Sequence, residues 1–213
     1  MNEFWEQRYS EPGYAYGTEP NAFLVSQRHR LKPGMKALAV ADGEGRNGVW
    51  LAQQGLEVLS VDASPTALKK ARGLAAARGT TIRTECTDLT GWSWPRDSFD
   101  LVAAIFIHFP PEHRPRMHRA MLDSLKPGGL LIMEAFHVDQ LKHKSGGPPV
   151  LEMLYAADML ARDFAGAERL ELQELLTELH EGAYHSGTAA VVRGVWRKPV
   201  AARGPRRGKT ARG

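Results

Sequence analysis

The stretch Lys36-Ala-Leu-Ala-Val-Ala-Asp-Gly-Glu-Gly-Arg-Asn-Gly48 decides the fold of this chain. Its apolar run predicts a buried strand. The three glycines that follow predict a tight turn into a helix, where missing side chains let the backbone approach a ligand. A second apolar run ends at Asp62, where a carboxylate can accept hydrogen bonds from both hydroxyls of a ribose. Together the two features predict a ligand built on adenosine.

The glycine spacing leaves the cofactor open. Glycines at positions 43, 45 and 48 spell G-x-G-x-x-G, and an acid follows roughly 20 residues later, as in dinucleotide-binding proteins. A plain strand-to-helix turn without a ligand has the same composition. The cofactor therefore has to be inferred from residues further along the chain.

Length and composition predict one globular domain. The 213 residues can bury a substantial core, and 43% hydrophobic with 24% charged residues is ordinary for such a protein. No apolar run reaches the roughly 20 residues of a membrane span, and the polar start is not a signal peptide, so we expect no membrane partner and a cytoplasmic location. The single cysteine, Cys86, excludes an internal disulfide, and we expect no metal site.

The positive charge is concentrated at the C-terminus. Of the formal net charge of +4, five positive charges and no acid lie in residues 199–213, so residues 1–198 are nearly neutral. The segment 199–213 lacks apolar anchors, which predicts a disordered basic tail after a domain that spans residues 1–198. A nearly neutral domain disfavours a nucleic-acid partner, and the sequence does not indicate an oligomeric state.

Apolar spacing predicts alternating strands and helices. The predicted strands are 36–41, 57–62, 81–86, 99–106, 130–136, 169–181 and 188–198. The predicted helices are 21–31, 46–54, 65–78, 111–125 and 150–163. The last two strands are joined by the short segment 182–187 and predict an antiparallel hairpin at one edge of a parallel sheet. A nicotinamide oxidoreductase would instead continue with three more parallel strands.

Five landmarks in residues 36–136 stand in the order and spacing of class I S-adenosylmethionine-dependent methyltransferases. They are the turn at 42–47, Val61-Asp62, Thr87-Asp88-Leu89, Phe99-Asp100-Leu-Val and Leu125-Lys-Pro-Gly-Gly129. The chain thus resembles this family. The resemblance implies an α/β fold with a single Rossmann-like, seven-stranded, mostly parallel sheet and a C-terminal antiparallel hairpin. It also implies a methyltransferase with S-adenosyl-L-methionine as cofactor.

The N-terminus narrows the resemblance. Phe4-Trp-Glu-Gln-Arg-Tyr9 and Tyr14-Ala-Tyr-Gly-Thr-Glu-Pro-Asn-Ala-Phe-Leu24 resemble the opening of the tellurite-resistance methyltransferases, a branch similar to thiopurine methyltransferases. Glu178-Leu-His180, followed by a basic and apolar last strand, is similar to the same branch. This resemblance implies an N-terminal lid over about residues 1–30.

Individual roles are implied by the same resemblance. Asp62 would bind the ribose hydroxyls, and Asp88 the adenine amine, with the Leu89 N–H at a ring nitrogen. The other implied cofactor contacts are Tyr16, Asp42, Gly43, Gly45, Asn47, Ala63 and Ile105. Arg8 and His180 are implied as catalytic residues beside the methyl acceptor. Structural alternatives stay open: a turn-capping acid at Asp88, a surface histidine at His180.

One departure from the family concerns the first strand. The family carries an acid and a glycine at the positions of Ala39 and Ala41, while this chain brings carboxylates into the turn with Asp42 and Glu44. The missing acid helps to hold the amino-acid end of the cofactor. Either Asp42 substitutes for it, or the cofactor is bound more weakly.

The resemblance implies methyl transfer to a small soft or anionic acceptor, a thiol or an oxyanion similar to tellurite or selenite. Two alternatives stay open. The basic tail is compatible with a methyltransferase that acts on RNA or protein, and Ala39 is compatible with a module that binds the cofactor without catalysis. The identity of the acceptor is not encoded in a recognisable motif.

Overall fold

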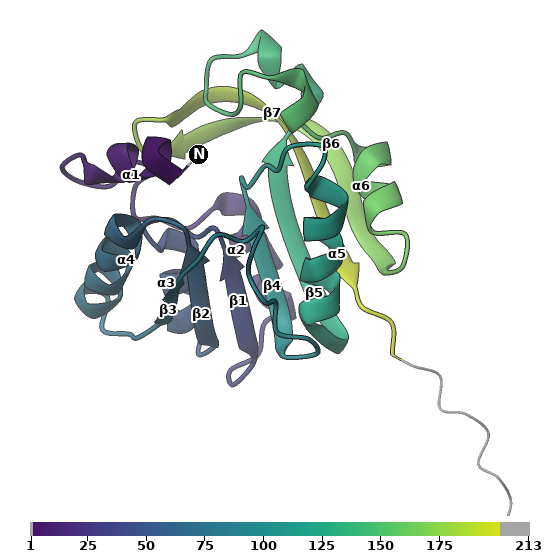
Figure 1. Cartoon of the computed structure of the whole chain (residues 1–213), viewed down its shortest axis with the longest axis horizontal. Coiled ribbons are helices and arrows are strands. Elements are labelled where there is room, and N and C mark those ends of the chain that lie inside the picture. The colour runs from purple at the N-terminus through teal and green to yellow at the C-terminus, as the bar shows by residue number, and fades with distance from the viewer. Residues whose placement is uncertain (1, 201–213) are drawn as a thin grey trace, which may run out of the picture.

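Residues 2–200 are described by a computed structural model, and they form one seven-stranded sheet (Figure 1). The strand order is β3-β2-β1-β4-β5-β7-β6, in which β7 runs antiparallel to both β5 and β6. The strands are β1 (Lys36–Val40), β2 (Glu57–Asp62), β3 (Arg83–Cys86), β4 (Phe99–Ile105), β5 (Leu125–Phe136), β6 (Glu168–Glu181) and β7 (His185–Arg197). The predicted fold class is confirmed.

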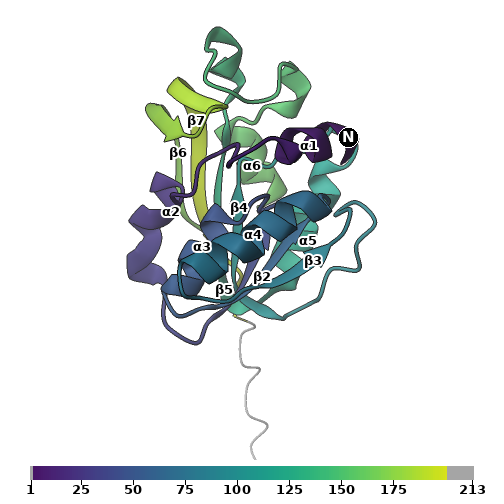
Figure 2. The ribbon, with the colours of Figure 1, turned by 90° about the vertical axis from the view of Figure 1, so that its left-hand side faces the viewer.

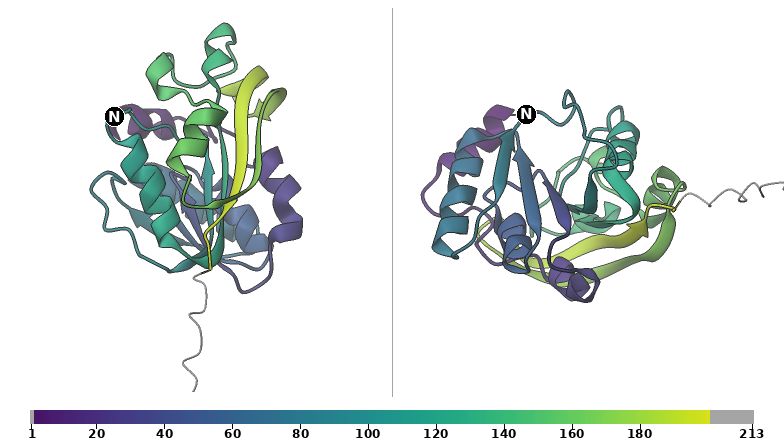
Figure 3. Two further views of the ribbon diagram at one scale, coloured as in Figure 1. Left: turned by 90° about the vertical axis from the view of Figure 1, so that its right-hand side faces the viewer. Right: turned by 90° about the horizontal axis from the view of Figure 1, so that it is seen from below.

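Helices cover both faces of the sheet (Figures 2 and 3). They are α1 (Asn2–Ser10), α2 (Ala22–Ser26), α3 (Arg46–Gln53), α4 (Pro65–Ala77), α5 (Arg114–Ser124) and α6 (Ala157–Asp163), with short 3-10 segments η1 (Gln27–Arg30), η2 (Val138–Lys142) and η3 (Leu151–Met153). One core cluster contains apolar residues of α2 and α3, and another those of α5 and α6. The central strands β1 and β4 are buried because both faces are covered.

Helix α4 begins where the sequence predicts it. Ser64 is the N-cap, its hydroxyl accepts the Ala67 N–H at 3.0 Å, and Pro65 occupies the first helical position. Such a cap satisfies a backbone donor that the helix itself cannot pair. The cap also fixes the direction in which the chain leaves β2, just beyond Asp62.

Several predicted segments differ from the structure. Strand β5 begins at Leu125 rather than at 130, and the predicted helix 21–31 is the short helix α2 followed by the 3-10 segment η1. Residues 2–10 form helix α1, where we expected no regular element. The predicted helix 150–163 is interrupted, because Tyr155 is buried and its N–H bonds to the Phe136 carbonyl at 3.0 Å. Strand β7 begins at His185 rather than at 188, so the loop of the last hairpin is shorter than expected. Most of the predicted basic tail, residues 201–213, lies outside the described residues.

Within residues 2–200, no helix has the length and apolarity that crossing a bilayer requires. In the same part of the chain, no group of three or more His, Cys, Asp and Glu side chains is arranged to hold a metal ion.

Candidate functional site

The candidate site lies at the carboxyl ends of β1 and β4. These strands are neighbours, and the chain leaves them toward opposite edges of the sheet, which makes this the position where open α/β sheets bind ligands. Ala41 follows β1 with φ 48°, and Phe106 follows β4 with φ 55°. Both are non-glycine residues in the left-handed region, a form of backbone strain that clusters at functional sites.

Asp62 ends β2 beside the glycine turn. Its carboxylate accepts the Gly43 N–H at 2.9 Å and the Ser64 N–H at 2.9 Å, and it is 7% exposed. Burial raises the pKa of Asp62, although these hydrogen bonds act in the opposite direction. The structure therefore places Asp62 against Gly43, in the position predicted for a ribose acceptor.

Asp42 faces the underside of the turn. It accepts the Gly48 N–H at 3.1 Å and the Ser60 hydroxyl at 2.8 Å. Burial raises the pKa of Asp42 to about 7, against the effect of the Ser60 and Gly48 hydrogen bonds. Both bonds tie Asp42 to α3 and β2, so in this structure its carboxylate is occupied within the turn.

The glycine turn is closely covered. A β-carbon on Gly43 would lie 2.7 Å from the Tyr9 hydroxyl of α1, and one on Gly45 would lie 2.6 Å from Ala71 Cβ of α4. Gly43 and Gly45 adopt φ 56° and 87°. Only glycine fits both the conformation and the space, which confirms the tight turn that the sequence predicts.

Helix α1 is attached to the body of the protein at the end of β2. Glu6 accepts hydrogen bonds from the hydroxyls of Ser64 and Thr66, at the start of α4. Trp5 stacks on Tyr9 with ring centroids 5.8 Å apart. A shallow pocket of about 460 Å³ lies between α1 and the start of α4 and includes Ala63 in its wall.

The segment after α1 is fastened by Glu44 of the glycine turn. The buried Glu44 carboxylate accepts the Ala15 N–H at 2.7 Å and pairs with Lys70 at 2.8 Å. Lys70 in turn donates to the carbonyls of Glu11 and Gly13. The turn thus holds the lid segment with its own side chain, which the sequence did not indicate.

Arg8 lies in an aromatic cage. Its guanidinium is 3.9 Å from the Tyr184 ring centroid and 4.7 Å from that of Phe4, and it donates to the Tyr16 hydroxyl at 3.1 Å. Such contacts stabilise a cation without neutralising it. Arg8 and Tyr16, both predicted for the site, are therefore in contact with each other.

The end of the β6–β7 hairpin completes the site. His185 is 7% exposed, and its ring centroid lies 4.4 Å from Tyr16 and 4.7 Å from Phe106. Its Nδ1 is 3.4 Å from Glu181 Oε2. The wall formed by Tyr16, His185 and Phe106 runs from the lid to the end of β4.

The structure does not bring His180 to this wall. Side chains alternate along a strand, and Leu179 is buried while His180 is exposed on the outer face of β6. The histidine that contacts the predicted site residues is His185. The prediction of β7 from residue 188 left His185 in a loop, where no inward face could be assigned to it.

The remaining predicted residues lie near the ends of the same strands or of the neighbouring strand β3. Ile105 is the buried last residue of β4, and Asn47 accepts the Asn21 N–H at 2.9 Å. Asp88 follows β3, next to the end of β2, and Leu89 beside it is buried. Asp88 is exposed and accepts the N–H and hydroxyl of Thr90, so it caps its own turn in the arrangement described.

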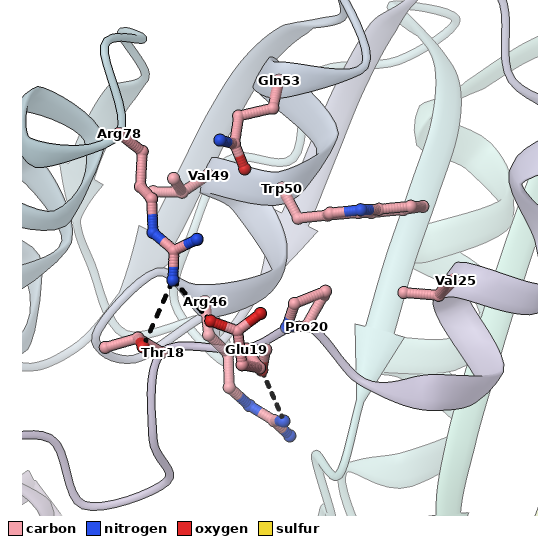
Figure 4. A pocket seen from close by; sticks show the side chains of 9 residues that line it. All are labelled: Thr18, Glu19, Pro20, Val25, Arg46, Val49, Trp50, Gln53 and Arg78. Carbon is pink, nitrogen blue, oxygen red and sulfur yellow. Dashed lines mark hydrogen bonds and ion pairs between the residues drawn. The ribbon is translucent and has the colours of Figure 1, made fainter.

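A separate pocket of about 360 Å³ lies along the outer side of α3 (Figure 4). Arg78 reaches across it to Glu19, while Trp50 and Val25 form its apolar side. Its lining contains none of the predicted site residues. We therefore place the functional site at the strand ends and not in this pocket.

Comparison with known proteins identifies a domain family and relatives of part of the chain. Residues 37–129 match the family described as "Methyltransferase domain". A probable thiol methyltransferase 2 from Arabidopsis thaliana is 35% identical over 123 residues, covering 55% of this chain and 52% of that protein. The chain spans only 37% of the length of three uncharacterized mycobacterial relatives, at 29% identity.

Solved structures share the fold over most of the chain. One concerns the conversion of a disulfide bond into a thioacetal group during echinomycin biosynthesis, with a TM-score of 0.77 and 21% identity, covering 95% of this chain and 93% of that one. TehB from Haemophilus influenzae has a TM-score of 0.69 and 18% identity, covering 92% and 66%. These likenesses establish the fold.

Proposed function

We propose that this chain, whose residues 37–129 match the methyltransferase-domain family, is a class I methyltransferase that transfers the methyl group of S-adenosylmethionine to a small soft or anionic acceptor, a thiol or an oxyanion such as tellurite or selenite. One observation carries the proposal. Arg8, Tyr16 and His185 form a polar group beside Phe106 at the end of β4, while Gly43 and Asp62 lie at the ends of the neighbouring strands β1 and β2.

The residues present fit the adenosyl part of the cofactor. Asp62 offers a carboxylate at the strand end, and Gly43 beside it has no side chain of its own, although Tyr9 of α1 covers Gly43 in this structure. The structure offers fewer free polar groups for the amino-acid end of the cofactor. Ala39 carries no acid, and the Asp42 carboxylate is occupied by Gly48 and Ser60. This supports the second sequence alternative, weaker binding of the cofactor's amino-acid end.

The proposed reaction depends mainly on how the protein positions the two reacting atoms. When bound, S-adenosylmethionine supplies an activated methyl group on a sulfonium, and transfer is an in-line displacement. Alignment of the two reacting atoms and exclusion of water then provide most of the acceleration. Helix α1 covers the glycine turn through Tyr9. Arg8 places a positive charge beside Tyr16, which contacts His185. A positive charge there favours an anionic acceptor.

The small size of the acceptor is inferred from the enclosure of the site. Tyr16 lies between the rings of His185 and Tyr184, and Gly182 packs against the backbone of Gly17. The lid segment and the last hairpin are therefore in contact with each other, which favours a small acceptor over a polymer. The name of the plant relative, a probable thiol methyltransferase, supports a soft acceptor.

The test has two steps. Isothermal titration calorimetry should give binding of S-adenosylmethionine and no binding of NAD. The loaded protein is then offered thiophenol, tellurite, selenite and a structured RNA, and formation of S-adenosylhomocysteine is followed by mass spectrometry. Turnover on thiol or oxyanion supports the proposal. Turnover on RNA alone, or binding without turnover on any acceptor, contradicts it and favours the RNA or non-catalytic alternatives.

A further inference from the structure

We propose that His185 accepts the proton of a thiol acceptor, and that Glu181 is the residue that positions His185 for this step. The proposal rests on the proposed function, since it concerns the acceptor side of the same site. It distinguishes a thiol that arrives with its proton from an acceptor that arrives already ionised.

Glu181 is held as a fixed anion. Its carboxylate pairs with Arg46 Nη2 at 2.7 Å and accepts from Asn21 Nδ2 at 3.0 Å, and both side chains are largely buried. Burial by itself would raise the pKa of Glu181, but the His185 hydrogen bond and the Arg46 charge outweigh it and hold the pKa at about 2. Glu181 is therefore ionised across the physiological range.

An ionised carboxylate can only accept hydrogen bonds, so the Nδ1 of a neutral His185 must carry the proton toward Glu181. The lone pair then resides on Nε2. None of the hydrogen bonds found among residues 2–200 involves His185 Nε2. The pair of His185 and Glu181 thus has a free proton acceptor at Nε2, while the hydrogen bond at Nδ1 fixes the orientation of the ring.

The ring of His185 lies among aromatic side chains at the end of β4. His185 contacts Phe106, which follows β4 with a strained backbone, and Tyr16, which is bonded to Arg8. The ring of Phe136 lies 5.2 Å from it on the β5 side. Aromatic rings of this kind make favourable contacts with sulfur. The surroundings of His185 are therefore those of a thiol site at the end of β4.

The other inward-facing histidines are committed elsewhere. His108 uses both ring nitrogens, with Nδ1 2.7 Å from the Met153 carbonyl and Nε2 accepting the Phe136 N–H at 3.2 Å. His118 is fully buried in the core and pairs with Asp163. Neither is available to an acceptor at the end of β4, which leaves His185.

The charges around His185 favour its neutral form. Burial lowers the pKa of His185, Glu181 opposes this, and the positive charges of Arg46 and Arg8 add to the lowering. The other titratable groups that face it are Tyr16, Tyr184 and His108. A neutral imidazole at neutral pH is the form that can take up a proton.

The step balances as follows. As the acceptor sulfur forms its bond to the methyl carbon, the bond from that carbon to the sulfonium breaks, and its electron pair stays on the departing sulfur. The thiol proton goes to His185 Nε2, and the resulting imidazolium is stabilised by Glu181. An alkyl thiol is at least as weakly acidic as a cysteine side chain, whose pKa is about 8.5, and needs this help at neutral pH, whereas an acidic thiophenol does not.

The experiment compares His185→Gln and Glu181→Gln with His180→Gln, a matched change on the exposed face of the same hairpin. Each variant is assayed with an alkyl thiol and with a nitro-substituted thiophenol that is ionised at neutral pH. His185→Gln should lower kcat for the alkyl thiol by about 100-fold or more, and for the thiophenol by no more than about threefold. His180→Gln should behave as the wild type with both.

A readout without cofactor tests the pair of His185 and Glu181 itself. In the free wild-type protein, two-dimensional NMR of ¹⁵N-labelled histidine should find the His185 proton on Nδ1. In Glu181→Gln that preference should be lost and the His185 pKa should fall, which moves the acidic limb of the kcat profile for the alkyl thiol to lower pH. A purely structural role for Glu181 would not move that limb.

The outcomes separate the two proposals. If the wild type binds no S-adenosylmethionine or methylates no acceptor, the proposed function fails and this inference falls with it. If the wild type methylates thiols but His185→Gln slows both thiols equally or neither, the proton-acceptor role alone is overturned. A His185 proton on Nε2 in the wild type also overturns it, whatever the activity.

Discussion

The carboxylate of Asp42 accepts the backbone N–H of Gly48 at 3.1 Å and so caps the first turn of α3 from outside the helix. The residue in the N-cap position, Gly45, has no side chain to do this. A β-carbon on residue 48 would overlap Asp42 Oδ2. The pair therefore couples a helix cap to the turn that approaches the ligand.

Gly48→Ala should destabilise the protein by about 1–3 kcal/mol, because the new methyl group displaces Asp42 and leaves a helix donor unpaired. Urea unfolding measures the change. The matched control is Gly73→Ala in α4, where no atom lies within 4 Å of an added β-carbon. That variant should gain roughly 0.5–1 kcal/mol from helix propensity. Equal effects at both positions would contradict the role of Asp42.

Stability should depend on pH through Asp42. Its pKa is raised from 3.8 to about 7 in the folded protein, so the folded state binds the proton more tightly than the unfolded state. The free energy of unfolding therefore falls as pH rises from about 4 to 7, by on the order of 1 kcal/mol per pH unit from this group.

Asp42→Asn removes this titration while it keeps an oxygen for Gly48. Relative to the wild type, the variant should gain stability steadily between pH 4 and 7 and no more above that range. Urea unfolding at pH 5 and pH 7 measures the difference, with the exposed Asp158→Asn as control. A difference from wild type that stays constant with pH would rule out a raised pKa at Asp42.

Asp62→Ala should weaken S-adenosylmethionine binding by about 1.5–3 kcal/mol, the scale of hydrogen bonds to a charged group. Calorimetry measures the affinity, and circular dichroism tests whether the fold survives. Because Asp62 also accepts the Gly43 N–H, the variant should lose some order in the glycine turn. Wild-type affinity in the variant would mean that the adenosine site has been placed wrongly.

Arg8→Gln should lower turnover and leave the dissociation constant of the cofactor within about threefold, since position and charge at the acceptor act on the reacting pair. Steady-state kinetics and calorimetry on the same preparation measure the two effects. The control is Arg162→Gln, in an exposed ion pair on α6. A parallel fall in affinity and turnover would instead assign Arg8 to the carboxylate of the cofactor.

The sheet could be predicted because each strand carries its own signal. The apolar runs before Asp62 and Phe106 mark buried parallel strands, and Ser64 with Pro65 marks the start of α4. Helix α1 could not be predicted in this way. Its contacts with Ser64 and Thr66 are made by Glu6, a polar residue with no periodic pattern around it.

The contact between Gly43 and Asp62 was easier to predict than the arrangement of the β6–β7 hairpin. Gly43 and Asp62 lie within one strand-helix-strand unit, and their spacing fixes their contact. His185 depends on the length of the hairpin loop, because a shift of one residue exchanges the two faces of a strand. The length of that loop could not be determined from the sequence, so the sequence could not tell which of the hairpin histidines, His180 or His185, faces inward.

The attachment of α1 has a consequence for the turnover rate of the proposed methyl transfer. Tyr9 covers Gly43, and Glu6 is hydrogen-bonded to the start of α4, so under the proposed function the cofactor product would leave over the glycine turn only after α1 has moved. Each catalytic cycle then includes the release and re-formation of these contacts. Product departure, rather than the chemical step, would set the ceiling on turnover when acceptor is plentiful. A variant with weaker α1 contacts would release the cofactor product faster and would also bind the cofactor less tightly.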